Sequence, residues 1–268
     1  NDQEDSSELK IPIVRIQKLK IDETNGALSE NEYEMPLFQE WEFPRENLHL
    51  GQLLGEGEFG QVIQAQAKGI LARDTVTTVA VKMLKENHND DDMKSLVSEM
   101  EVMKMIGKHR NILNLLGCCS QRGPLFVITE FTENGNLLYF LRKLPQNFDK
   151  AMEIRLISWA IQIAEGMCYL ASVRCVHRDL AARNILVTND YTMKIADFGL
   201  ARDVRSTYYY KKKTNGKLPV KWMAPETIFR NRYTSKSDVW SYGILLWEME
   251  TLGGVPYPLY SDIEKLFK

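Results

Sequence analysis

The chain has 268 residues, of which 44% are apolar and 26% are charged, and its formal net charge at pH 7 is −2. This composition is ordinary for a folded globular protein and excludes a disordered chain, a collagen-like chain and a disulfide-dense toxin. The longest apolar stretches, such as Gly243–Trp247, are far shorter than the roughly 18–20 residues that cross a bilayer, so we expect no membrane span. The small net charge and the lack of an aromatic and basic pattern argue against a nucleic-acid partner.

The four cysteines indicate a reducing compartment. They have neither the even spacing of a disulfide framework nor the paired spacing of a zinc site, and most lie inside apolar stretches. We therefore expect them to be buried as small hydrophobic side chains. They are Cys118, Cys119, Cys168 and Cys175.

Residues 1–47 form a polar and acidic first segment. Residues 1–48 contain 12 acidic and 5 basic side chains, and the short apolar run from Ile11 to Ile16 has no sustained period. This composition predicts a largely flexible leader. Because no signal-peptide pattern follows Asn1, we expect the chain to be a piece of a longer protein.

From residue 48 the pattern changes to short β-type runs. Strands are predicted over residues 48–54, 60–67 and 75–83. A helix is predicted over residues 90–105, where apolar side chains recur at helical spacing, and two further strands over 113–118 and 125–131. These elements predict a strand-rich small lobe with one helix.

A complete G-x-G-x-x-G-x-V motif follows the first strand. Glycines lack a Cβ, so the backbone can lie close to a triphosphate and present its N–H groups to it. The motif alone is a weak signal, since a glycine-rich hairpin without a function has the same appearance. β-type sequence continues after it, which favours a β-hairpin lid over a dinucleotide-binding turn from strand to helix. The motif consists of Gly55, Glu56, Gly57, Glu58, Phe59, Gly60, Gln61 and Val62.

Lys82 ends the sequence Val79-Ala80-Val81-Lys82 on the third predicted strand. A lone strand lysine is usually just exposed. Here Glu99 lies 17 residues on, at the edge of the apolar face of the predicted helix, where a carboxylate should find a cation. We expect Lys82 to bridge Glu99 and the α- and β-phosphates of a nucleotide.

Beyond Gly135 the chain is mainly helical. Apolar residues from Leu156 to Leu170 recur at steps of three and four, which predicts an amphipathic helix. Short strands are expected at 175–176, 185–187 and 193–196. Residues 239–249 are apolar on nearly every face, which predicts a helix buried in the centre of a second lobe.

The most specific motif is His177-Arg178-Asp179-Leu180-Ala181-Ala182-Arg183-Asn184. In this pattern Asp179 accepts the proton of a substrate hydroxyl, and Asn184 holds a magnesium ion. Asp197, in Asp197-Phe198-Gly199, would bind magnesium that bridges the phosphates. Ala224-Pro225-Glu226 closes the activation segment that follows.

From about Trp41 to Lys268 the chain resembles a protein tyrosine kinase, and most closely the fibroblast growth factor receptor kinases. The Ala-Ala-Arg after Asp179 and the sequence Leu218-Pro219-Val220-Lys221-Trp222 are the tyrosine-kinase form. The narrower resemblance is carried by residues 79–85, 96–117, 175–187 and 209–226.

The resemblance implies a bilobal α+β kinase fold: a small antiparallel-sheet lobe with one helix, and a mainly helical lobe. It implies a flexible juxtamembrane segment at residues 1–47, a kinase N-lobe and hinge at 48–132, and a C-lobe at 133–268 that lacks its last helices. It also implies an ATP-dependent receptor tyrosine kinase that uses Mg²⁺ and binds MgATP between its lobes. The chain would lie on the cytoplasmic side of a cell membrane.

Further site residues follow from the same resemblance. Adenine would lie between Leu54, Val62, Ala80 and Leu186, with its edge bonded to the backbone of residues 130–132. Asn136 matches a position near the ribose, Arg183 one beside the catalytic loop, and Thr129 the gatekeeper position. The expected ATP-binding set is therefore Leu54, Gly55, Glu56, Gly57, Glu58, Phe59, Gly60, Val62, Ala80, Lys82, Thr129, Glu130, Phe131, Thr132, Asn136, Arg183 and Leu186.

Several tyrosines match regulatory positions of the family. Tyr209 and Tyr210 align with the paired activation-loop tyrosines, whose phosphorylation we expect to raise activity. Tyr33 resembles a docking tyrosine, and the run from Ile11 to Ile21 faintly resembles an adaptor-binding segment. The implied partners are protein tyrosine substrates, a receptor dimer partner and SH2- or PTB-type adaptors.

Two other interpretations stay open. A pseudokinase scaffold would bind partners without catalysis, although Lys82, Glu99, Asp179, Asn184 and Asp197 are all present. A serine/threonine or dual-specificity kinase is opposed by Ala181-Ala182-Arg183. Glu226 lacks the arginine partner that the family places in its later helices, so we expect lower stability in this chain.

Overall fold

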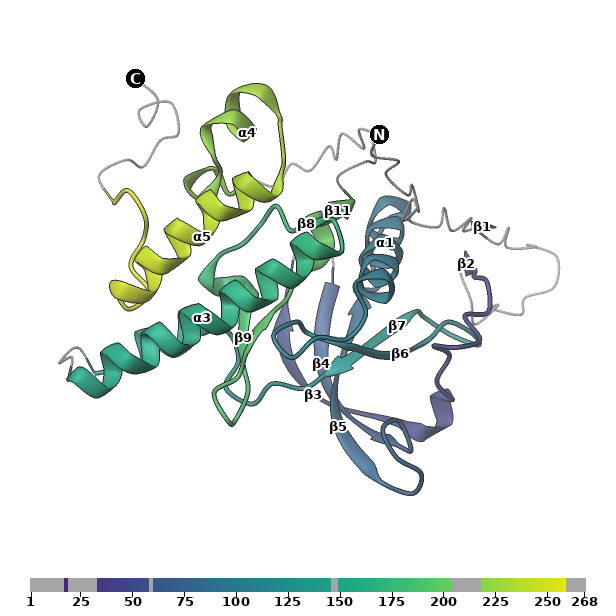
Figure 1. The fold of residues 1–268 in the computed structure, drawn as a ribbon. Coiled ribbons are helices and arrows are strands. Elements are labelled where there is room, and N and C mark those ends of the chain that lie inside the picture. The colour runs from purple at the N-terminus through teal and green to yellow at the C-terminus, as the bar shows by residue number, and fades with distance from the viewer. Residues whose placement is uncertain (1–16, 19–32, 58–59, 146–148, 204–217, 259–268) are drawn as a thin grey trace, which may run out of the picture. The chain divides into compact units, whose positions relative to one another are not determined.

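The computed structural model describes residues 17–18, 33–57, 60–145, 149–203 and 218–258. The chain divides into two compact units, shown with their elements in Figure 1. The sheet unit contains the described residues of 12–108 and 114–131, and the helical unit contains those of 109–113 and 132–258. No helix in these ranges is long and apolar enough to span a bilayer.

The sheet unit is built on five antiparallel strands in the order β3-β4-β5-β7-β6. Helix α1, Asp90–Ile106, contacts strands β5 and β6 of the sheet. Asn89 caps its first turn: its side chain accepts hydrogen bonds from the amides of Asp91 and Asp92, which satisfies two N–H groups that a helix leaves unpaired. The strands are β3 Leu48–Glu56, β4 Gly60–Lys68, β5 Val76–Leu84, β6 Leu115–Cys119 and β7 Phe126–Glu130, with a separate pair, β1 Gln17–Lys18 and β2 Tyr33–Glu34.

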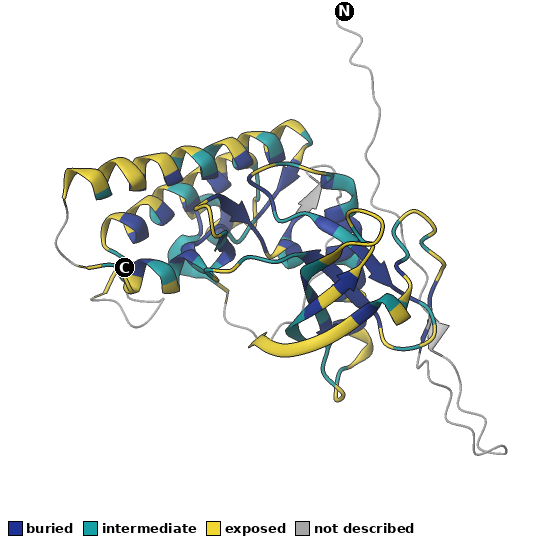
Figure 2. Ribbon diagram, turned by 90° about the horizontal axis from the view of Figure 1, so that it is seen from below, coloured by how far each residue is buried: buried dark blue, intermediate teal, exposed yellow. Residues whose placement is uncertain are grey.

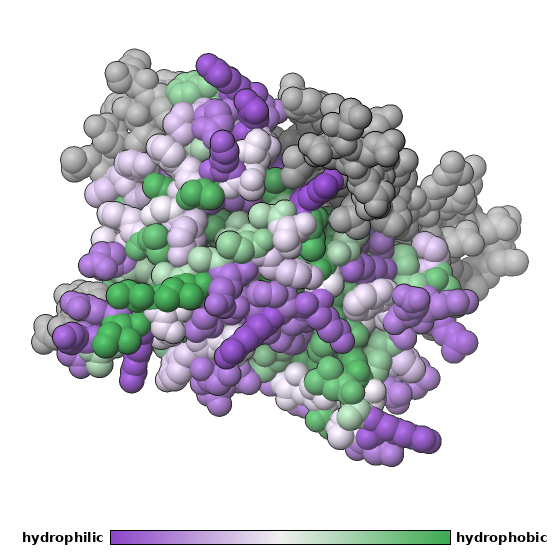
Figure 3. Space-filling model, viewed as in Figure 1, coloured by the Kyte–Doolittle hydropathy of each residue, from purple (hydrophilic) through white to green (hydrophobic). Residues whose placement is uncertain are grey.

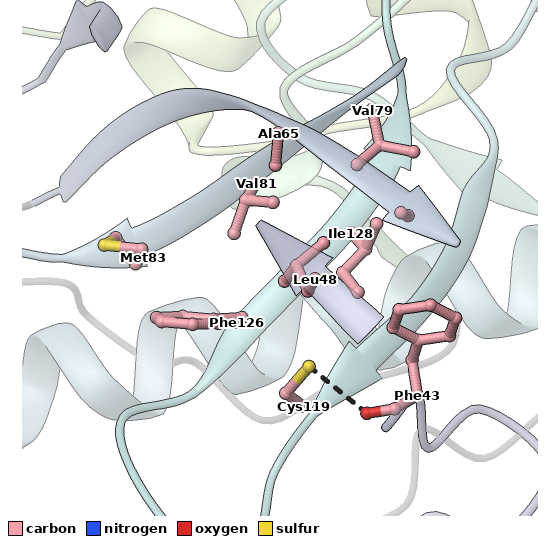
Figure 4. Close-up of a cluster of buried hydrophobic side chains, with 10 residues drawn as sticks. Phe43, Leu48, Ala65, Val79, Val81, Met83, Cys119, Phe126 and Ile128 are labelled. Atoms are coloured by element: carbon pink, nitrogen blue, oxygen red, sulfur yellow. Dashed lines mark hydrogen bonds between the residues drawn. The ribbon is translucent and has the colours of Figure 1, made fainter. Parts of the chain in front are cut away.

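Alternation along β5 separates the core from the opposite face of the sheet. Val79, Val81 and Met83 are buried, whereas Ala80 and Lys82 are only partly covered. Since side chains of a strand alternate between faces, Lys82 lies on the face opposite the core. Figure 4 shows the core cluster, which consists of Phe43, Leu48, Ala65, Ala67, Val79, Val81, Met83, Cys119, Phe126 and Ile128.

Residues 33–47 pack against the sheet through hydrogen bonds to β6 and to the residue that follows it. The amide of Phe43 donates to the carbonyl of Cys118, and the amide of Cys118 donates to the carbonyl of Trp41, both at 2.7 Å. The Glu42 carboxylate accepts hydrogen bonds from the amide and hydroxyl of Ser120, at 2.9 and 2.6 Å. The acidic residues that suggested a solvated segment therefore include one used as a structural acceptor. A short 3-10 helix, Arg45–Asn47, leads into β3.

The helical unit contains four α-helices among its described residues: α2 Leu137–Arg142, α3 Lys150–Ser172, α4 Pro225–Arg230 and α5 Ser235–Glu250. Helix α3 packs against β10 and α5. Gly166 permits the approach to β10, because a Cβ at this position would lie 2.7 Å from the Ile195 side chain. The short strands pair as β8 Cys175–Val176 with β11 Arg202–Asp203, and β9 Ile185–Val187 with β10 Met193–Ile195.

Helix α5 is more exposed than the prediction of a helix buried in the centre of the second lobe. Leu245 and Met249 are buried, but Val239 and Trp240 are 66% and 44% exposed. Asp238 and Glu248 are 3% and 1% exposed. The helix therefore turns two carboxylates inward, and these hydrogen-bond to a loop described below, which hydropathy alone does not indicate.

All four cysteines are free thiols. Cys118, Cys119 and Cys175 are buried as predicted, whereas Cys168 on α3 is exposed. Burial raises the pKa of Cys118 to about 12 and that of Cys119 to about 11. Figure 2 shows that α3 has exposed residues along one side and buried ones along the other.

Candidate functional site

The glycine motif connects β3 and β4 as the predicted β-hairpin. The amide of Gly57 donates to the carbonyl of Gly60 at 2.8 Å and closes the turn. A Cβ on Gly60 would lie 2.9 Å from the carbonyl oxygen of Met83, so a side chain here would push β4 away from β5. Glu58 and Phe59, at the tip, lie outside the described residues.

Lys82 and Glu99 form the ion pair that the sequence predicted. The Nζ atom of Lys82 lies 2.7 Å from both carboxylate oxygens of Glu99. The side chain of Lys82 is 34% exposed and that of Glu99 is 11% exposed. Helix α1 thus holds the carboxylate in place, while the ammonium group keeps a solvent-facing side from which it can bind an anion.

Several predicted nucleotide-contacting residues of the sheet unit share the face that carries Lys82. Val62 pairs with Lys82, and Ala80 pairs with Thr129. Thr129 is 8% exposed, whereas Leu54 on β3 is 42% exposed. Strand register therefore places three of these side chains beside the lysine.

The polar groups of Glu130 are already used within the sheet unit. Its amide donates to the carbonyl of Asn114 at 3.2 Å, and its carboxylate accepts from the amide and side chain of Asn114 at 2.7 and 2.9 Å. The Glu130 carbonyl accepts from the Thr129 hydroxyl at 3.3 Å, so a ligand edge that bonds to this carbonyl would share it.

In the helical unit, two other predicted residues bind the side chain of Asp179. The Nδ2 atom of Asn184 donates to a carboxylate oxygen of Asp179 at 2.9 Å and to its carbonyl at 2.7 Å. The Arg183 guanidinium binds the other carboxylate oxygen, and it also stacks over the ring of Trp222 at 4.6 Å. The short 3-10 helix Ala182–Asn184 folds the loop back so that these side chains converge.

Buried carboxylates of α5 hold the backbone of this loop. Asp238 accepts from the amides of His177 and Arg178, at 2.8 and 3.0 Å. Glu248 accepts from the amide of Ala182 and the indole N–H of Trp222, each at 2.9 Å. Burial raises the pKa of both carboxyls, and the hydrogen bonds that they accept lower it. The sequence reasoning missed Asp238 and Glu248; their one signal is an acidic residue within an otherwise apolar helix.

Burial is also the main cause that raises the pKa of Asp179. The charge of Asp197 raises it further, while Arg183, His177 and the Asn184 hydrogen bond lower it. The raised pKa makes Asp179 a better proton acceptor than an ordinary aspartate.

Asp197 and Asn184 suit a hard divalent cation, which prefers oxygen ligands. Asp197 is exposed, and its carboxylate accepts a long 3.4 Å bond from the Gly199 amide. Its backbone is left-handed, with φ of 62°, while the neighbouring Phe198 is buried against His177. Asn184 binds Asp179 through its amide nitrogen, which leaves its amide oxygen for a cation. This donor set fits Mg²⁺.

Two further predicted nucleotide contacts lie close together in the helical unit. Asn136 forms an isolated bridge with Leu186 on β9. The side-chain oxygen of Asn136 accepts from the amide of Tyr139 at 2.9 Å and caps α2. Leu186 is partly exposed between buried Ile185 and Val187, so its side chain is the one that β9 offers to a ligand.

The predicted regulatory tyrosines have different outcomes. Tyr209 and Tyr210 lie outside the described residues. Tyr33 is 8% exposed, and its hydroxyl donates to Asp90 at 2.8 Å. Docking through Tyr33 would therefore require this segment to leave its place against α1.

Glu226 is half-buried rather than fully buried. The loss of folding stability expected from an unpaired carboxylate at this position is therefore reduced.

The chain is similar to several curated proteins. It is 53% identical to fibroblast growth factor receptor homolog 2 of Drosophila melanogaster over 98% of this chain and 28% of that protein. It is 54% identical to fibroblast growth factor receptor homolog 1 of the same species, over 96% of this chain and 37% of that protein. It is 53% identical to the fibroblast growth factor receptor of Strongylocentrotus purpuratus, over 88% of this chain and 25% of that protein. The chain thus spans well under half the length of these relatives.

The resemblance stated from the motifs is confirmed by these identities, and the kinase fold by the elements described above. Residues 48–268 match the protein family described as protein tyrosine and serine/threonine kinase. The chain therefore belongs to the protein tyrosine and serine/threonine kinase family.

Proposed function

We propose that this chain is the kinase domain of a receptor tyrosine kinase and transfers the γ-phosphoryl group of ATP to protein tyrosine hydroxyls. The observation that carries the proposal is the arrangement at Asp179, where Arg183 and Asn184 orient a half-buried carboxylate of raised pKa. A carboxylate so held can accept a hydrogen bond from a hydroxyl and direct its oxygen toward a phosphorus atom.

The reaction is an in-line displacement. The tyrosine oxygen forms a bond to the γ-phosphorus, the bond from that phosphorus to the β-phosphate oxygen breaks, and ADP leaves. The hydroxyl proton passes to Asp179 as the new bond forms. Lys82, fixed by Glu99, would bind the α- and β-phosphates of the same ATP molecule, and the glycine hairpin would offer backbone N–H groups to them.

Mg²⁺ is the cation that we propose for Asp197 and Asn184; when bound, it neutralises charge that develops on the phosphates. Asn184 would then link the cation to the base, since its amide also binds Asp179. Arg183 keeps Asp179 ionised and oriented, and its own position is fixed by Trp222.

The tyrosine specificity is supported by Ala181-Ala182-Arg183 and by the relatives that the chain matches. Substrates would be the chain itself, in trans, and other signalling proteins. By the same likeness the whole protein would be a single-pass receptor for a fibroblast-growth-factor-like ligand, with this chain in the cytoplasm, a receptor partner and SH2- or PTB-type adaptors. Tyr209 and Tyr210 would be the activating phosphorylation sites, and Tyr33 a docking site when released.

The test is a Mg²⁺- and ATP-dependent autophosphorylation assay with mass-spectrometric mapping, run beside Lys82→Met. We expect phosphate on tyrosine in the wild-type chain and none in the variant. A matched peptide panel with tyrosine or serine at the acceptor position tests specificity. Equal transfer to serine would contradict the tyrosine assignment, and absence of any transfer would favour the pseudokinase interpretation.

A double variant tests the activation loop. Tyr209→Phe/Tyr210→Phe should lose the rate increase that follows autophosphorylation, because no phosphate would be available to order the loop. A double variant that is activated as fully as the wild type would show that these tyrosines do not regulate the enzyme.

A further inference from the structure

Residues 33–38, which we call the anchoring segment, contact helix α1 at both of its ends. At the first turn, the hydroxyl of Tyr33 donates to the Asp90 carboxylate at 2.8 Å. At the last turn, the ammonium group of Lys104 lies over the ring of Phe38, 3.5 Å from the ring centroid. The segment therefore holds the helix at two points that are nearly a full helix length apart.

The two contacts lie on the side of α1 opposite Glu99. Lys104 lies 14 residues after Asp90, and at 100° per residue the two positions are about 40° apart around the helix. Glu99 lies nine residues after Asp90, about 180° away. On that far side the Nζ atom of Lys82 is 2.7 Å from both carboxylate oxygens of Glu99. The helix is therefore held from two sides, by the anchoring segment and by the ion pair.

The side of α1 that faces the segment carries a second ion pair, which is well covered. The carboxylate of Glu101 binds Lys104 at 2.8 Å, and the two side chains are 7% and 11% exposed. A cation that has lost most of its water gains more from an aromatic ring than an exposed cation does. Removing the ring of Phe38 would therefore uncover a desolvated pair, and the last turn of α1 would no longer be fixed on this side.

The sheet unit holds the anchoring segment in place. The side-chain amide of Gln121, two residues after β6, donates to the carbonyl of Met35 at 3.2 Å. Hydrophilic side chains predominate on the face shown in Figure 3, but the apolar side chains of Tyr33 and Met35 are each 8% exposed. The segment is therefore packed into its unit rather than laid on the surface, and it can fix the helix relative to the sheet.

We propose that Tyr33 and Phe38 are positioning residues: the anchoring segment holds α1 where Glu99 pairs with Lys82, and its loss lowers the efficiency with which the chain uses ATP. The inference rests on the proposed kinase function, since that function gives the Lys82–Glu99 pair its role in binding the phosphates of ATP. Both positioning residues act through the helix, from the side away from Lys82.

Steady-state kinetics of the purified 268-residue chain on a tyrosine peptide test this role. Phe38→Ala should lower kcat/KM for ATP by about three- to tenfold, because α1 is no longer fixed and Glu99 leaves Lys82 for part of the time. Tyr33→Phe, which removes the hydroxyl alone, should lower it by about two- to threefold. Leu37→Ala, at a neighbouring side chain that is 56% exposed, is the matched control and should leave it unchanged. All variants are assayed below the lowest thermal midpoint.

A double variant separates positioning from a general loss of structure. In Glu99→Gln the carboxylate partner of Lys82 is already lost, so adding Phe38→Ala should change kcat/KM by less than about 1.5-fold. A residue that merely stabilised the fold would lower kcat/KM by the same factor with and without Glu99.

The reactivity of Lys82 tests the same coupling without phosphoryl transfer. Only a neutral amine attacks an acetylating reagent, and a bonded carboxylate favours the charged ammonium form. Phe38→Ala should therefore raise the acetylation rate of Lys82 at least about threefold relative to that of Lys68, an exposed lysine on β4. Leu37→Ala should not raise it. Mass-spectrometric peptide mapping measures both rates.

Three results would overturn the proposal. One is a value of kcat/KM in Phe38→Ala no lower than in Leu37→Ala, another is an equal loss with and without Glu99, and the third is unchanged reactivity of Lys82 in Phe38→Ala. A wild-type chain that transfers no phosphate would instead contradict the proposed function. The acetylation rates would then still decide whether the anchoring segment holds the ion pair.

Discussion

The two units hold their charged site residues by different means. In the sheet unit, Lys82 and Glu99 project from a regular strand and a regular helix and bind each other directly at 2.7 Å. In the helical unit, Asp179 lies in an irregular loop, and the loop backbone is fixed by two carboxylates from another helix. Regular elements need one side-chain pair to position a group, whereas a loop needs its own N–H groups satisfied first.

The two units also differ in the free energy that it costs to remove their charged groups from water. Asp238 and Glu248 are almost fully buried, and burial raises the pKa of each. The helical unit thus tolerates two desolvated carboxylates in order to hold one loop. The Lys82–Glu99 pair keeps partial contact with solvent and costs less to desolvate. Substitutions in the two units should therefore fail in different ways: loss of folding in one, loss of orientation in the other.

The largest expected effect is on the reaction itself. Asp179→Asn should lower kcat by about 10²- to 10⁴-fold, because the proton acceptor is lost while the backbone supports remain. The measurement is single-turnover transfer to a tyrosine peptide at saturating ATP, with the thermal midpoint as a folding check. Transfer at the wild-type rate would show that Asp179 is not the base.

Asp238→Ala tests the buried support of the loop. It leaves the amides of His177 and Arg178 without acceptors, so the free energy of unfolding should fall by about 2–4 kcal/mol. Urea titration followed by circular dichroism measures it. Glu250→Ala, an exposed change on the same helix, should cost no more than about 0.5 kcal/mol. Equal losses in the two variants would mean that Asp238 is not a support.

Glu99→Gln tests the ion pair of the sheet unit, in which Lys82 and Glu99 bind each other directly. Lys82 would keep its position on β5 but lose its oriented partner, so kcat/KM should fall by about 10- to 100-fold with little change in stability. Steady-state kinetics and a thermal scan together make the measurement. If stability falls as far as in Asp238→Ala, the proposed contrast between the units is wrong.

The pH dependence tests the environment of Asp179. Its pKa is raised by burial, so the ionised base should be lost at a higher pH than for an ordinary aspartate as the solution is acidified. Removing the nearby cation by Arg183→Ala should move this acid limb of kcat/KM to still higher pH. An acid limb that stays in place in the variant would show that Arg183 does not set the pKa of Asp179.

The smallest effect concerns residues 33–47. Tyr33→Phe removes the hydrogen bond to Asp90 and should lower the free energy of unfolding by about 1 kcal/mol. Tyr139→Phe, on a tyrosine that is 57% exposed, is the control and should change it by less than about 0.5 kcal/mol. Hydrogen exchange of the α1 amides reports whether the loss is local; unchanged exchange there would contradict the role of this contact.

Much of the fold could be predicted from local pattern. Alternation located β4 and β5 within one or two residues, and helical spacing located α1 and the inner face of α3. The motif around Asp179 predicted which residues meet there, since Asn184 and Arg183 lie within five positions of it. Contacts of this short range depend on the loop alone.

Contacts over long range could not be predicted in this way. Tyr33 and Asp90 are 57 residues apart, and Ala182 and Glu248 are 66 apart. The contacts that residues 33–47 make with α1 and β6 are of the same kind, since their partners lie more than 50 positions away in the chain.

The unequal burial of the cysteines gives the molecule a natural attachment point for a reporter. Cys118 and Cys119 are buried and their thiols stay protonated, whereas Cys168 is exposed on α3, three residues after Glu165. A maleimide dye should therefore react first at Cys168 without any engineered change. Its fluorescence would then follow events along that helix in the unmodified sequence.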